Sequence, residues 1–375
     1  MKNILVLSDS KVIAGAEKIL INILSGLNGE NYRFITVTSE EGPLSERLRE
    51  KGIQCNIVPM TFNNFSLRYF RHLKVTFELL KLMKKNNIDL IFCNRAIVGK
   101  YGSILKIITG KPCIWHLHDI YDNFPGDRLA YFTDKFIAVS NAVKNSFPAK
   151  LKDKISVIYN GLQEEQTKSA VDDSSIKNEL GISGTEKIVL LPGRITPWKG
   201  QKLFIEAAKF VAERRKDIKF LIVGDVVHSA SLTKDTEFKR DLINLISVYH
   251  LENVMFTGWR DDVNELMNLA DVVVNCSIKP EPLATTIIEA MNAGKPVICT
   301  PSGGNPELVI NNENGIVLGS DDPVEFGTAV LRIFDNENCL INMGKRGKEI
   351  AADKFSYNVF ISKIHNLIQQ TFANA

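Results

Sequence analysis

Residues 281–289 read Glu281-Pro-Leu-Ala-Thr-Thr-Ile-Ile-Glu289, and the chain continues Ala-Met-Asn-Ala-Gly-Lys-Pro-Val-Ile. Apolar runs at 270–275 and 296–300 flank this stretch, and their β-branched residues are typical of buried strands in a parallel sheet. The stretch therefore predicts a strand, a loop, a helix that starts near Ala284, and a second strand. Ligands of such units collect beyond the carboxyl ends of the strands, where free N–H groups of the helix can hold an anion.

Two carboxylates stand at the ends of this stretch. Glu281 lies in the predicted loop, and Glu289 lies in the helix, where it either occupies a polar edge or faces a ligand. Two glutamates separated by seven residues resemble the acidic pair of the retaining glycosyltransferase family 4. The resemblance implies that Glu281 reads the donor sugar and that Glu289 holds the ribose. Backbone N–H groups of Leu283, Ala284 and Thr285 would then meet the sugar and the diphosphate.

One position departs from the family pattern. After Glu281-Pro282 the family commonly has Phe-Gly, whereas this chain has Leu283-Ala284. An alanine in place of glycine should narrow the sugar pocket, so the departure leaves the donor sugar undetermined.

Length and composition limit the class of protein. The chain has 375 residues, 45% of them hydrophobic and 24% charged, with a formal net charge of +3. This length exceeds what one ordinary core supports, so two domains are expected. The charge balance argues against nucleic acid as a partner. The six cysteines are scattered without a Cys-x-x-Cys, which favours reduced thiols. No signal peptide or membrane-spanning run is expected, and we predict a cytoplasmic protein.

Apolar runs typical of strands alternate with segments of helical period. The runs are 4–7, 34–38, 55–58, 90–93, 113–117, 136–139 and 156–159, and then 188–191, 220–223, 254–256, 272–275, 297–299 and 316–318. This alternation predicts an α/β protein with two Rossmann-like parallel-sheet domains, which in the GT-B fold of the family face a central cleft.

The domain limits follow from the same pattern. The predicted N-terminal domain is 1–163, a polar linker region is 164–185, and the C-terminal domain is 186–356. By the resemblance, the first domain binds the acceptor, the second binds the nucleotide sugar, and a final helix at 357–372 crosses back onto the first.

A second motif, Gly193-Arg-Ile-Thr-Pro-Trp-Lys-Gly200, follows a predicted strand. Its glycines permit a sharp turn, and Arg194 and Lys199 project two positive charges from one loop. Alone, this could be a surface loop with solvated cations. The family has Gly-Arg and then Lys-Gly here, which implies that Arg194 and Lys199 bind the donor diphosphate and stabilise the charge of the leaving group.

The chain contains no Asp-x-Asp, the pattern that would supply a divalent metal to the diphosphate. We therefore predict that no metal or other cofactor is required. The absence of Gly-x-Gly-x-x-Gly and of a P-loop also argues against a dinucleotide oxidoreductase or a P-loop enzyme.

His118 ends a predicted strand in Trp115-His-Leu-His118-Asp119. His116 and His118 lie on one face of that strand, which allows a metal site, although no third ligand is near in the sequence. The resemblance instead places His118 beside the donor sugar and the reacting carbon. A histidine hydrogen-bonded only to the backbone is the alternative.

Three further positions match the family. Gly15, in Val12-Ile-Ala-Gly-Ala, falls where the family has two glycines close to the donor phosphate and the acceptor. Gly258 and Trp259 fall in the loop whose backbone meets the nucleotide base. Trp259 either stacks on that base or is a partly buried aromatic residue, and the sequence does not separate the two.

Residues 65–85 form a basic amphipathic segment. Its cations, against the single acid Glu78, are Arg68, Arg71, Lys74, Lys81, Lys84 and Lys85. The apolar set Leu73, Phe77 and Leu80 recurs at helical spacing, so we expect this face to pack on the sheet of the first domain. A second interpretation adds contact of its basic end and exposed aromatics with an anionic membrane surface, which would bring a lipid-linked acceptor within reach.

Together the motifs favour a retaining GT-B glycosyltransferase that moves a hexose or N-acetylhexosamine from a nucleotide diphosphate sugar, UDP-linked before GDP-linked, to a glycan or lipid-linked hydroxyl. The family's retention is ascribed to front-face attack, so no protein nucleophile is expected. Richness in Lys, Ile and Asn is associated with bacterial proteins and hence with cell-surface polysaccharide synthesis. Two alternatives stay open: a nucleotide-sugar epimerase of the same fold, and a non-catalytic nucleotide-sugar-binding subunit.

Overall fold

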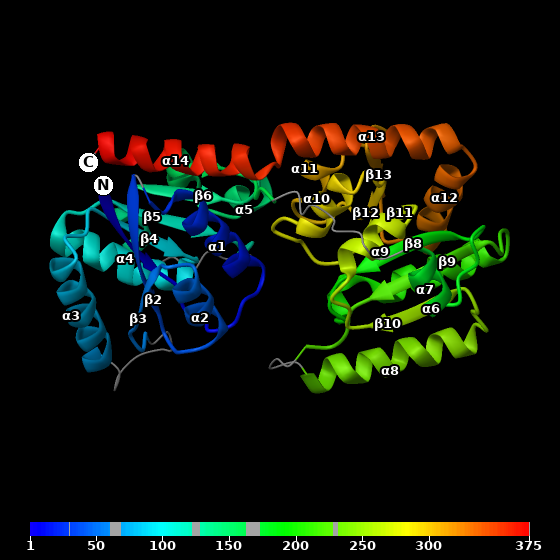
Figure 1. Cartoon of the computed structure of the whole chain (residues 1–375), viewed down its shortest axis with the longest axis horizontal. Helices are drawn as coiled ribbons and strands as arrows, with labels where there is room; N and C mark the ends of the chain where they lie inside the picture. Colours follow the sequence, from blue (N-terminus) through cyan, green and yellow to red (C-terminus); the bar gives the residue numbers. More distant parts are fainter. Residues whose placement is uncertain (30, 61–68, 122–127, 163–172, 228–231, 375) are drawn as a thin grey trace. The chain divides into compact units, whose positions relative to one another are not determined.

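The computed structural model describes residues 1–29, 31–60, 69–121, 128–162, 173–227 and 232–374 (Figure 1). The chain divides into two compact units, one formed by Met1–Gly161 with Tyr357–Ala375 and the other by Leu162–Ser356. The first is called the N-terminal unit and the second the C-terminal unit. Each is an α/β unit on a parallel sheet, so the predicted fold class is confirmed.

The N-terminal unit is built on a seven-stranded parallel sheet in the order β3-β2-β1-β4-β5-β6-β7. The strands are β1 (Lys2–Leu7), β2 (Tyr32–Thr38), β3 (Gln54–Ile57), β4 (Leu90–Asn94), β5 (Cys113–Leu117), β6 (Lys135–Ala138) and β7 (Ile155–Val157). The helices are α1 (Gly15–Leu27), α2 (Pro43–Glu50), α3 (Tyr69–Lys85), α4 (Ala96–Thr109), η1 (Arg128–Phe132), α5 (Asn141–Asn145) and η2 (Ala149–Lys154). Every strand predicted in this part is present. The central strands are marked by apolar runs because helices cover both of their faces.

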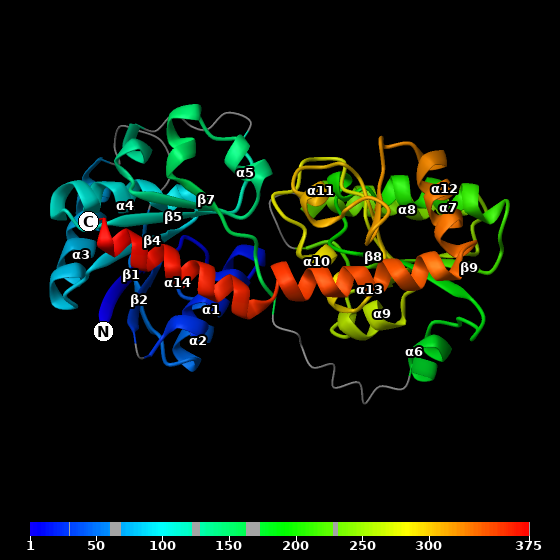
Figure 2. The same cartoon turned by 90° about the horizontal axis from the view of Figure 1, so that it is seen from above.

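The last helix of the chain completes this unit. Helix α14 (Tyr357–Ala373) packs on α1 (Figure 2). The Tyr357 hydroxyl donates to the carbonyl oxygen of Asn22 at 3.1 Å, and the Tyr32 hydroxyl lies 3.2 Å from Nδ1 of His365. Its buried apolar side chains are Phe360, Ile364, Leu367 and Ile368. Since burial of such a side chain stabilises by about 1.5–3 kcal/mol, α14 supplies a large share of the stability of the N-terminal unit.

The C-terminal unit is built on a six-stranded parallel sheet in the order β10-β9-β8-β11-β12-β13. The strands are β8 (Lys187–Pro192), β9 (Ile218–Val223), β10 (Val254–Gly258), β11 (Val272–Asn275), β12 (Val297–Cys299) and β13 (Gly315–Val317). The helices are α6 (Asp173–Glu179), η3 (Pro197–Lys199), α7 (Gln201–Ala212), α8 (Leu232–Val248), α9 (Val263–Leu269), α10 (Thr285–Asn292), α11 (Asn305–Leu308), α12 (Pro323–Phe334) and α13 (Glu337–Lys354). Helix α10 begins directly after its N-cap Ala284, where the sequence predicts a helix start.

In both sheets the strand order reverses at the first strand of the unit. In the N-terminal unit the chain places β2 on one side of β1 and β4 on the other, and β9 and β11 flank β8 in the same way. The loops after the two strands at such a switch point run apart, and ligands of open α/β sheets bind there. The candidate site residues can therefore be sought after β1 and β4 and after β8 and β11.

The predicted linker region 164–185 differs from the structure. Residues 164–172 lie outside the described residues, but the remainder includes helix α6, which packs against α9. Ile176, Leu180 and Ile182 are buried in the C-terminal unit. Because these apolar residues pack there, the second half of the segment belongs to the C-terminal unit. The polar composition of the segment as a whole gave no sign of this apolar stripe.

The face of α3 that packs on the sheet also differs from the prediction. The buried residues are Val75, Thr76, Leu79 and Met83, whereas Leu73 and Phe77 are 52% and 58% exposed. Phe70 is 82% exposed on the same outer side. Residues 65–68 of the predicted segment lie outside the described residues. Helix α3 thus carries two apolar stripes. In the one chosen from the sequence Leu73 and Phe77 are exposed and Leu80 is half-buried.

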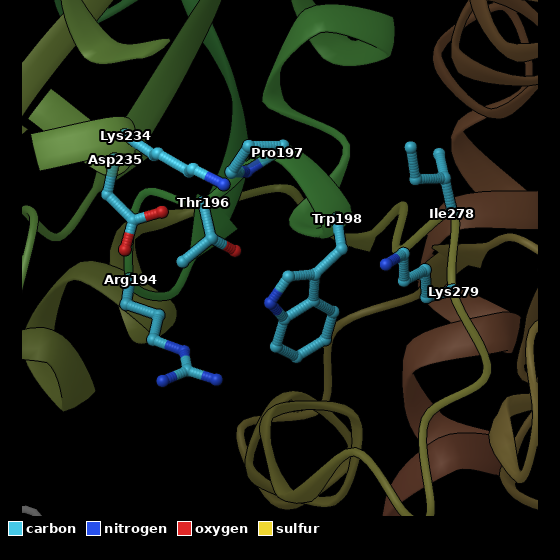
Figure 3. A pocket seen from close by; sticks show the side chains of 8 residues that line it. All are labelled: Arg194, Thr196, Pro197, Trp198, Lys234, Asp235, Ile278 and Lys279. Carbon is cyan, nitrogen blue, oxygen red and sulfur yellow. The ribbon is translucent and has the colours of Figure 1, made fainter. Parts of the chain in front are cut away.

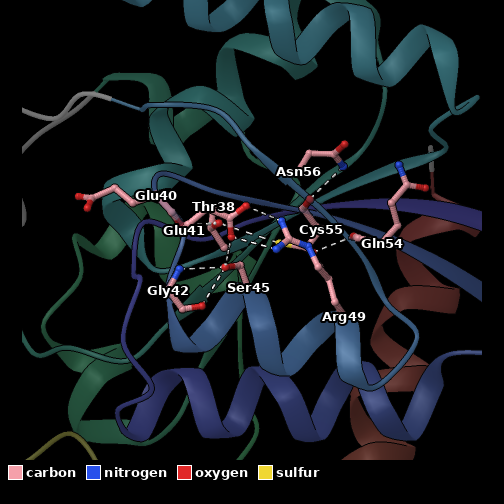
Figure 4. A network of polar contacts seen from close by, with 10 residues as sticks. Thr38, Glu40, Glu41, Gly42, Ser45, Arg49, Gln54, Cys55 and Asn56 are labelled. Carbon is pink, nitrogen blue, oxygen red and sulfur yellow. Dashed lines mark hydrogen bonds and ion pairs between the residues drawn. The ribbon is translucent and has the colours of Figure 1, made fainter.

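The start of α2 supports the loop that follows β1. The Glu41 carboxylate accepts two hydrogen bonds from Arg49, at 2.7 and 2.9 Å, and one from Ser45 at 2.7 Å (Figure 4). The N–H group of Leu44, in the first turn of α2, donates to the carbonyl oxygen of Lys11 at 3.0 Å. This network fixes the start of α2, and α2 in turn fixes the loop between β1 and α1.

Candidate active site

The loop after β8 carries the Gly193–Gly200 motif and lies against the chain after β11. It contains η3 and ends at Gly200, where α7 begins. Gly200 has φ +77°, and a Cβ there would lie 1.9 Å from the carbonyl oxygen of Cys276. Only glycine permits this approach, so the motif brings two loops of the switch point into contact.

Lys199, Ser277 and Glu281 meet where these two loops touch. Nζ of Lys199 lies 2.5 Å from Oε1 of Glu281, and the Ser277 hydroxyl donates to the same oxygen. Glu281 is 6% exposed, so its carboxylate has lost most of its hydration. The two donors compensate for this loss. Within the described part of the chain no hydrogen bond reaches Oε2 of Glu281. That oxygen can accept a hydrogen bond from a ligand.

The backbone of Glu281 is held as firmly as its side chain. Its carbonyl oxygen accepts from the N–H group of Gly304 at 2.7 Å. Gly303 has φ +60°, and a Cβ on it would lie 2.1 Å from the same carbonyl oxygen. The loop after β12 therefore packs closely against the backbone of Glu281 and holds it in place.

Arg194 and Lys199 flank the indole ring of Trp198. The guanidinium carbon of Arg194 lies 5.2 Å from the ring centroid and Nζ of Lys199 lies 4.6 Å from it, both within cation–π range. A cavity of about 290 Å³ opens beside them. Figure 3 shows Trp198 between Lys234 with Asp235 on one side and Ile278 with Lys279 on the other. The cavity therefore joins an aromatic wall to several cations.

Helix α10 places the other predicted donor contacts beyond Glu281. Leu283 and Ala284 are buried before the helix, and Thr285 is its first residue, with a backbone N–H group at the helix N-terminus. Glu289 is half-buried and lies four residues after Thr285, hence on the same face of the helix. Glu289 therefore lies on the helix face that begins at the N-terminus of α10.

Gly258 is the last residue of β10, two strands away from β8, and Trp259 follows it. The N–H group of Gly224 donates to the carbonyl oxygen of Gly258 at 2.9 Å. Trp259 is 68% exposed, with its indole nitrogen 3.3 Å from Oδ1 of Asp261. Its ring is thus available for stacking, and the interpretation as a partly buried aromatic residue does not hold.

In the N-terminal unit, His118 follows β5 and is half-buried. Its Nε2 lies 3.0 Å from Oδ1 of Asn94, within hydrogen-bond distance. The alternative of a histidine that is hydrogen-bonded only to the backbone therefore does not hold. Burial, with His116 and Arg95 nearby, holds the pKa of His118 well below its ordinary value. The imidazole is therefore neutral at pH 7 and suits hydrogen bonding to a hydroxyl group better than binding an anion.

Gly15 is the first residue of α1, and a Cβ on it would meet no atom within 4 Å. The preceding N–H group, of Ala14, donates to Oε2 of Glu17 at 3.1 Å. The space beside Gly15 is therefore open. The end of the loop is held by the side chain of Glu17 in α1. Among the described residues, no group of three or more His, Cys, Asp or Glu side chains could hold a metal ion.

The structure brings Arg194, Lys199 and Glu281 together. Leu283 and Ala284 lie just before helix α10, and Thr285 and Glu289 lie on it. Sequence analysis missed Ser277 and Gly303, which fix Glu281 from two other loops. It also missed Arg95 and Glu17, an ion pair in the N-terminal unit with 3.6 Å between Nε and Oε1. Their contacts join residues far apart in sequence, so no local pattern marks them.

Comparisons with known proteins cover nearly the whole chain. Residues 172–350 match the family model of glycosyl transferases group 1, and residues 13–166 match that of glycosyltransferase family 4. The Escherichia coli UDP-Gal:alpha-D-GlcNAc-diphosphoundecaprenol alpha-1,3-galactosyltransferase is 27% identical over 376 residues, which cover 95% of this chain and 94% of that protein.

Two further similarities concern a relative and a solved structure. The lipopolysaccharide 1,2-N-acetylglucosaminetransferase of Salmonella typhimurium is 28% identical over 220 residues, covering 58% of this chain and 56% of that protein. The crystal structure of Anabaena Alr3699/HepE in complex with UDP and glucose matches with a TM-score of 0.81 at 26% identity. That match covers 98% of this chain and 100% of the other.

Proposed function

The chain belongs to the glycosyl transferases group 1 and to glycosyltransferase family 4, and from this premise we propose that it transfers a hexose or N-acetylhexosamine from a UDP-sugar with retention of configuration. It is a glycosyltransferase that acts on a nucleotide sugar. The acceptor in this proposal is a hydroxyl group of a lipid-linked glycan, in bacterial cell-surface polysaccharide synthesis. The names of the Escherichia coli and Salmonella relatives, and the UDP bound in the Anabaena structure, support these choices.

The observation that carries the proposal is the contact of Lys199 and Ser277 with one oxygen of Glu281, beside Arg194. Two cations and an oriented carboxylate at a switch point suit a diphosphate next to a sugar. Lys199 contacts Glu281, and a bound diphosphate would share that ammonium group. Oε2 of Glu281 then accepts from a sugar hydroxyl.

The mechanism requires no protein nucleophile. Arg194 and Lys199 take up the charge that develops on the departing diphosphate, and the N–H groups at the start of α10 add to this stabilisation. Glu289 accepts hydrogen bonds from the ribose, the Gly258–Trp259 turn meets the base, and His118 meets the donor sugar. A phosphate oxygen of the donor accepts the proton of the attacking hydroxyl on the same face.

Metal independence forms part of the proposal. Fixed cations on Arg194 and Lys199 replace the charge that magnesium or manganese supplies in other transferases. We expect full activity in the presence of EDTA. A loss of activity that manganese restores would refute this part while leaving the transferase assignment intact.

We also place the protein on the inner face of the membrane through α3. Phe70, Leu73 and Phe77 are exposed on this helix together with Arg71 and Lys74, a combination that suits an anionic lipid surface. Among the described residues, no helix has the length and apolarity needed to cross a membrane.

Vesicle sedimentation tests the membrane contact. Binding to vesicles with phosphatidylglycerol should exceed binding to pure phosphatidylcholine and should fall severalfold in Phe77→Ser. Val248→Ser is the matched control, because Val248 is 70% exposed on α8 of the C-terminal unit. Equal binding by both variants and the wild type would exclude a role for α3.

Calorimetry with UDP and GDP in metal-free buffer, followed by transfer assays with UDP-hexoses, tests the central proposal. UDP should bind more tightly than GDP, and Glu281→Ala should retain UDP binding while losing about 10²–10³-fold in kcat. Proton NMR of the product gives the anomeric configuration. Binding of neither nucleotide would overturn the proposal, and conversion of the donor without an acceptor would favour the epimerase.

A further inference from the structure

The switch point of the N-terminal unit contains many buried polar atoms that lack a hydrogen bond among the described residues. Strands β1, β4 and β5 are neighbours in the sheet, and their ends lead into Ser8 and Asp9, into Asn94 and Arg95, and into His118. Among the described residues, fourteen buried side-chain polar atoms lack a hydrogen bond, and seven of them belong to this edge: Ser8 Oγ, Asp9 Oδ1, Glu17 Oε1, Asn94 Nδ2, Arg95 Nε, and both ring nitrogens of His116. Since buried polar groups are normally satisfied, such a concentration indicates that a ligand or water completes the site.

Arg95 is held in an unusual position at this edge. Its φ is +108°, a region that a non-glycine residue rarely occupies, and its N–H group donates to the carbonyl oxygen of His116 at 2.9 Å. Nε lies 3.6 Å from Oε1 of Glu17, a carboxylate that is fully buried. Within the described part of the chain, no hydrogen bond reaches the two terminal nitrogens of Arg95. Glu17 thus fixes the guanidinium through Nε and leaves its outer edge for a ligand.

Asp9 lies across the switch point from Arg95. It is half-buried two residues after the end of β1, and Arg95 stands two residues after Cys93, the partner of Leu7 on the neighbouring β4. Burial raises the pKa of the Asp9 carboxyl, and the charge of Arg95 opposes that rise. An acceptor and a donor therefore lie near each other at the same edge of the sheet, with the half-buried His118 also near Arg95.

The balance of charge identifies the kind of ligand. Arg95 contributes one positive charge, whereas Glu17, Asp9 and the nearby Asp119 contribute carboxylates. His118 is neutral. A phosphate here would be repelled by the carboxylates, because the single positive charge of Arg95 does not outweigh them. Hydroxyl groups of a sugar both donate and accept, so they match a mixed set of guanidinium, carboxylate and amide groups.

We propose that Asp9 and Arg95, with Arg95 positioned by the buried Glu17, recognise the hydroxyl groups of a neutral sugar, and that this sugar is the acceptor of the transfer. The second clause rests on the proposed function, whereas sugar binding at this edge does not. Glu17 is a positioning residue, because it acts on the sugar only through Arg95. Specificity for the acceptor would accordingly reside at the ends of β1 and β4.

Saturation-transfer difference NMR of the full chain with methyl α-glycosides of N-acetylglucosamine, galactose and glucose tests the sugar site directly. The measurement uses a Glu281→Ala background, in which the donor-sugar position is weakened, and includes UDP as a second reporter. Asp9→Asn keeps the shape of the side chain, and Asp153→Asn, on an exposed residue of η2, is its control. Arg95→Met alone would leave Glu17 uncompensated, so Glu17→Gln/Arg95→Met is the second variant.

At least one glycoside should give a signal that falls about tenfold in Asp9→Asn and in the double variant, with the UDP signal unchanged and Asp153→Asn like its parent. No glycoside signal in the Glu281→Ala background, or a signal that both variants retain, would overturn the inference. Absence of the UDP signal from the wild type would instead overturn the proposed function, so the two failures are separable. In transfer assays the same variants should raise the KM for the acceptor more than they lower kcat.

Discussion

Replacing His116 by methionine is expected to make the N-terminal unit less sensitive to acid. The imidazole is fully buried in β5, and neither ring nitrogen has a hydrogen-bond partner among the described residues. Burial lowers the pKa of His116 from 6.5 to about 3. The native state therefore requires a neutral ring, whereas the unfolded chain can bind a proton.

The size of the effect follows from these two pKa values. Below pH 6.5 the unfolded state binds more protons than the folded state, so stability falls as the pH falls, until protonation of the folded state begins near pH 3. Between pH 7 and pH 5 one such histidine removes about 2 kcal/mol from the free energy of unfolding. His118, whose ring centroid lies 4.0 Å away, has a lowered pKa as well but is present in both proteins. The difference between wild type and variant thus reports His116.

Urea unfolding at pH 7 and pH 5, followed by tryptophan fluorescence, measures this difference. Trp115 neighbours His116 and is buried, and a Trp198→Phe/Trp259→Phe background leaves it as the only tryptophan of the chain. At pH 7 the methionine variant should be at least as stable as its parent, because it removes two unsatisfied polar atoms.

At pH 5 the variant should exceed its parent by about a further 2 kcal/mol. His250→Asn, at an exposed position, should follow its parent at both pH values. If His116→Met lost stability between pH 7 and pH 5 as steeply as its parent, the imidazole would not be held neutral in the folded state. The account of this edge as an unsatisfied, desolvated site would then fail.

Three predictions concern the C-terminal unit. Lys199→Met should lower kcat about 10²–10³-fold, whereas Lys202→Met, which removes a 63%-exposed side chain from the next helix, should leave steady-state rates unchanged. Gly303→Ala should displace the backbone of Glu281 and lower kcat more than it lowers UDP affinity; unchanged kinetics would show that the loop yields without cost. Glu289→Ala should weaken UDP binding about 10–100-fold by calorimetry, and an unaltered Kd would remove this residue from the ribose.

The strands and the two sheets could be predicted because burial on both faces makes each strand apolar along its length, as at 90–94 and 272–275. The contact between Lys199 and Glu281 could be expected only from the family resemblance, since the two residues stand 82 positions apart. Ser277 and Gly303 gave no signal, because a serine after a strand and a glycine in a loop have many uses. Their effect on Glu281 emerges only when three loops of one sheet edge come together.

Helix α3 shows that helical periodicity alone does not predict which face of a helix is buried. Leu73 and Phe77 recur at helical spacing, and so do Val75, Leu79 and Met83, so the pattern defines two apolar stripes without ranking them. Tertiary packing selects the stripe that fits the sheet. Arg95 shows a different limit, since a positive φ is expected of glycine or asparagine and not of arginine.

The return of α14 to the N-terminal unit has a consequence for biosynthesis. The ribosome delivers residues 1–161 first, but the helix that completes their fold is translated last, after the whole of 162–356. The C-terminal unit can thus reach its native state while the earlier-made unit still lacks one of its covering helices. A premature stop codon just after residue 356 would therefore yield a chain whose C-terminal unit is whole and whose N-terminal unit is incomplete and prone to aggregation.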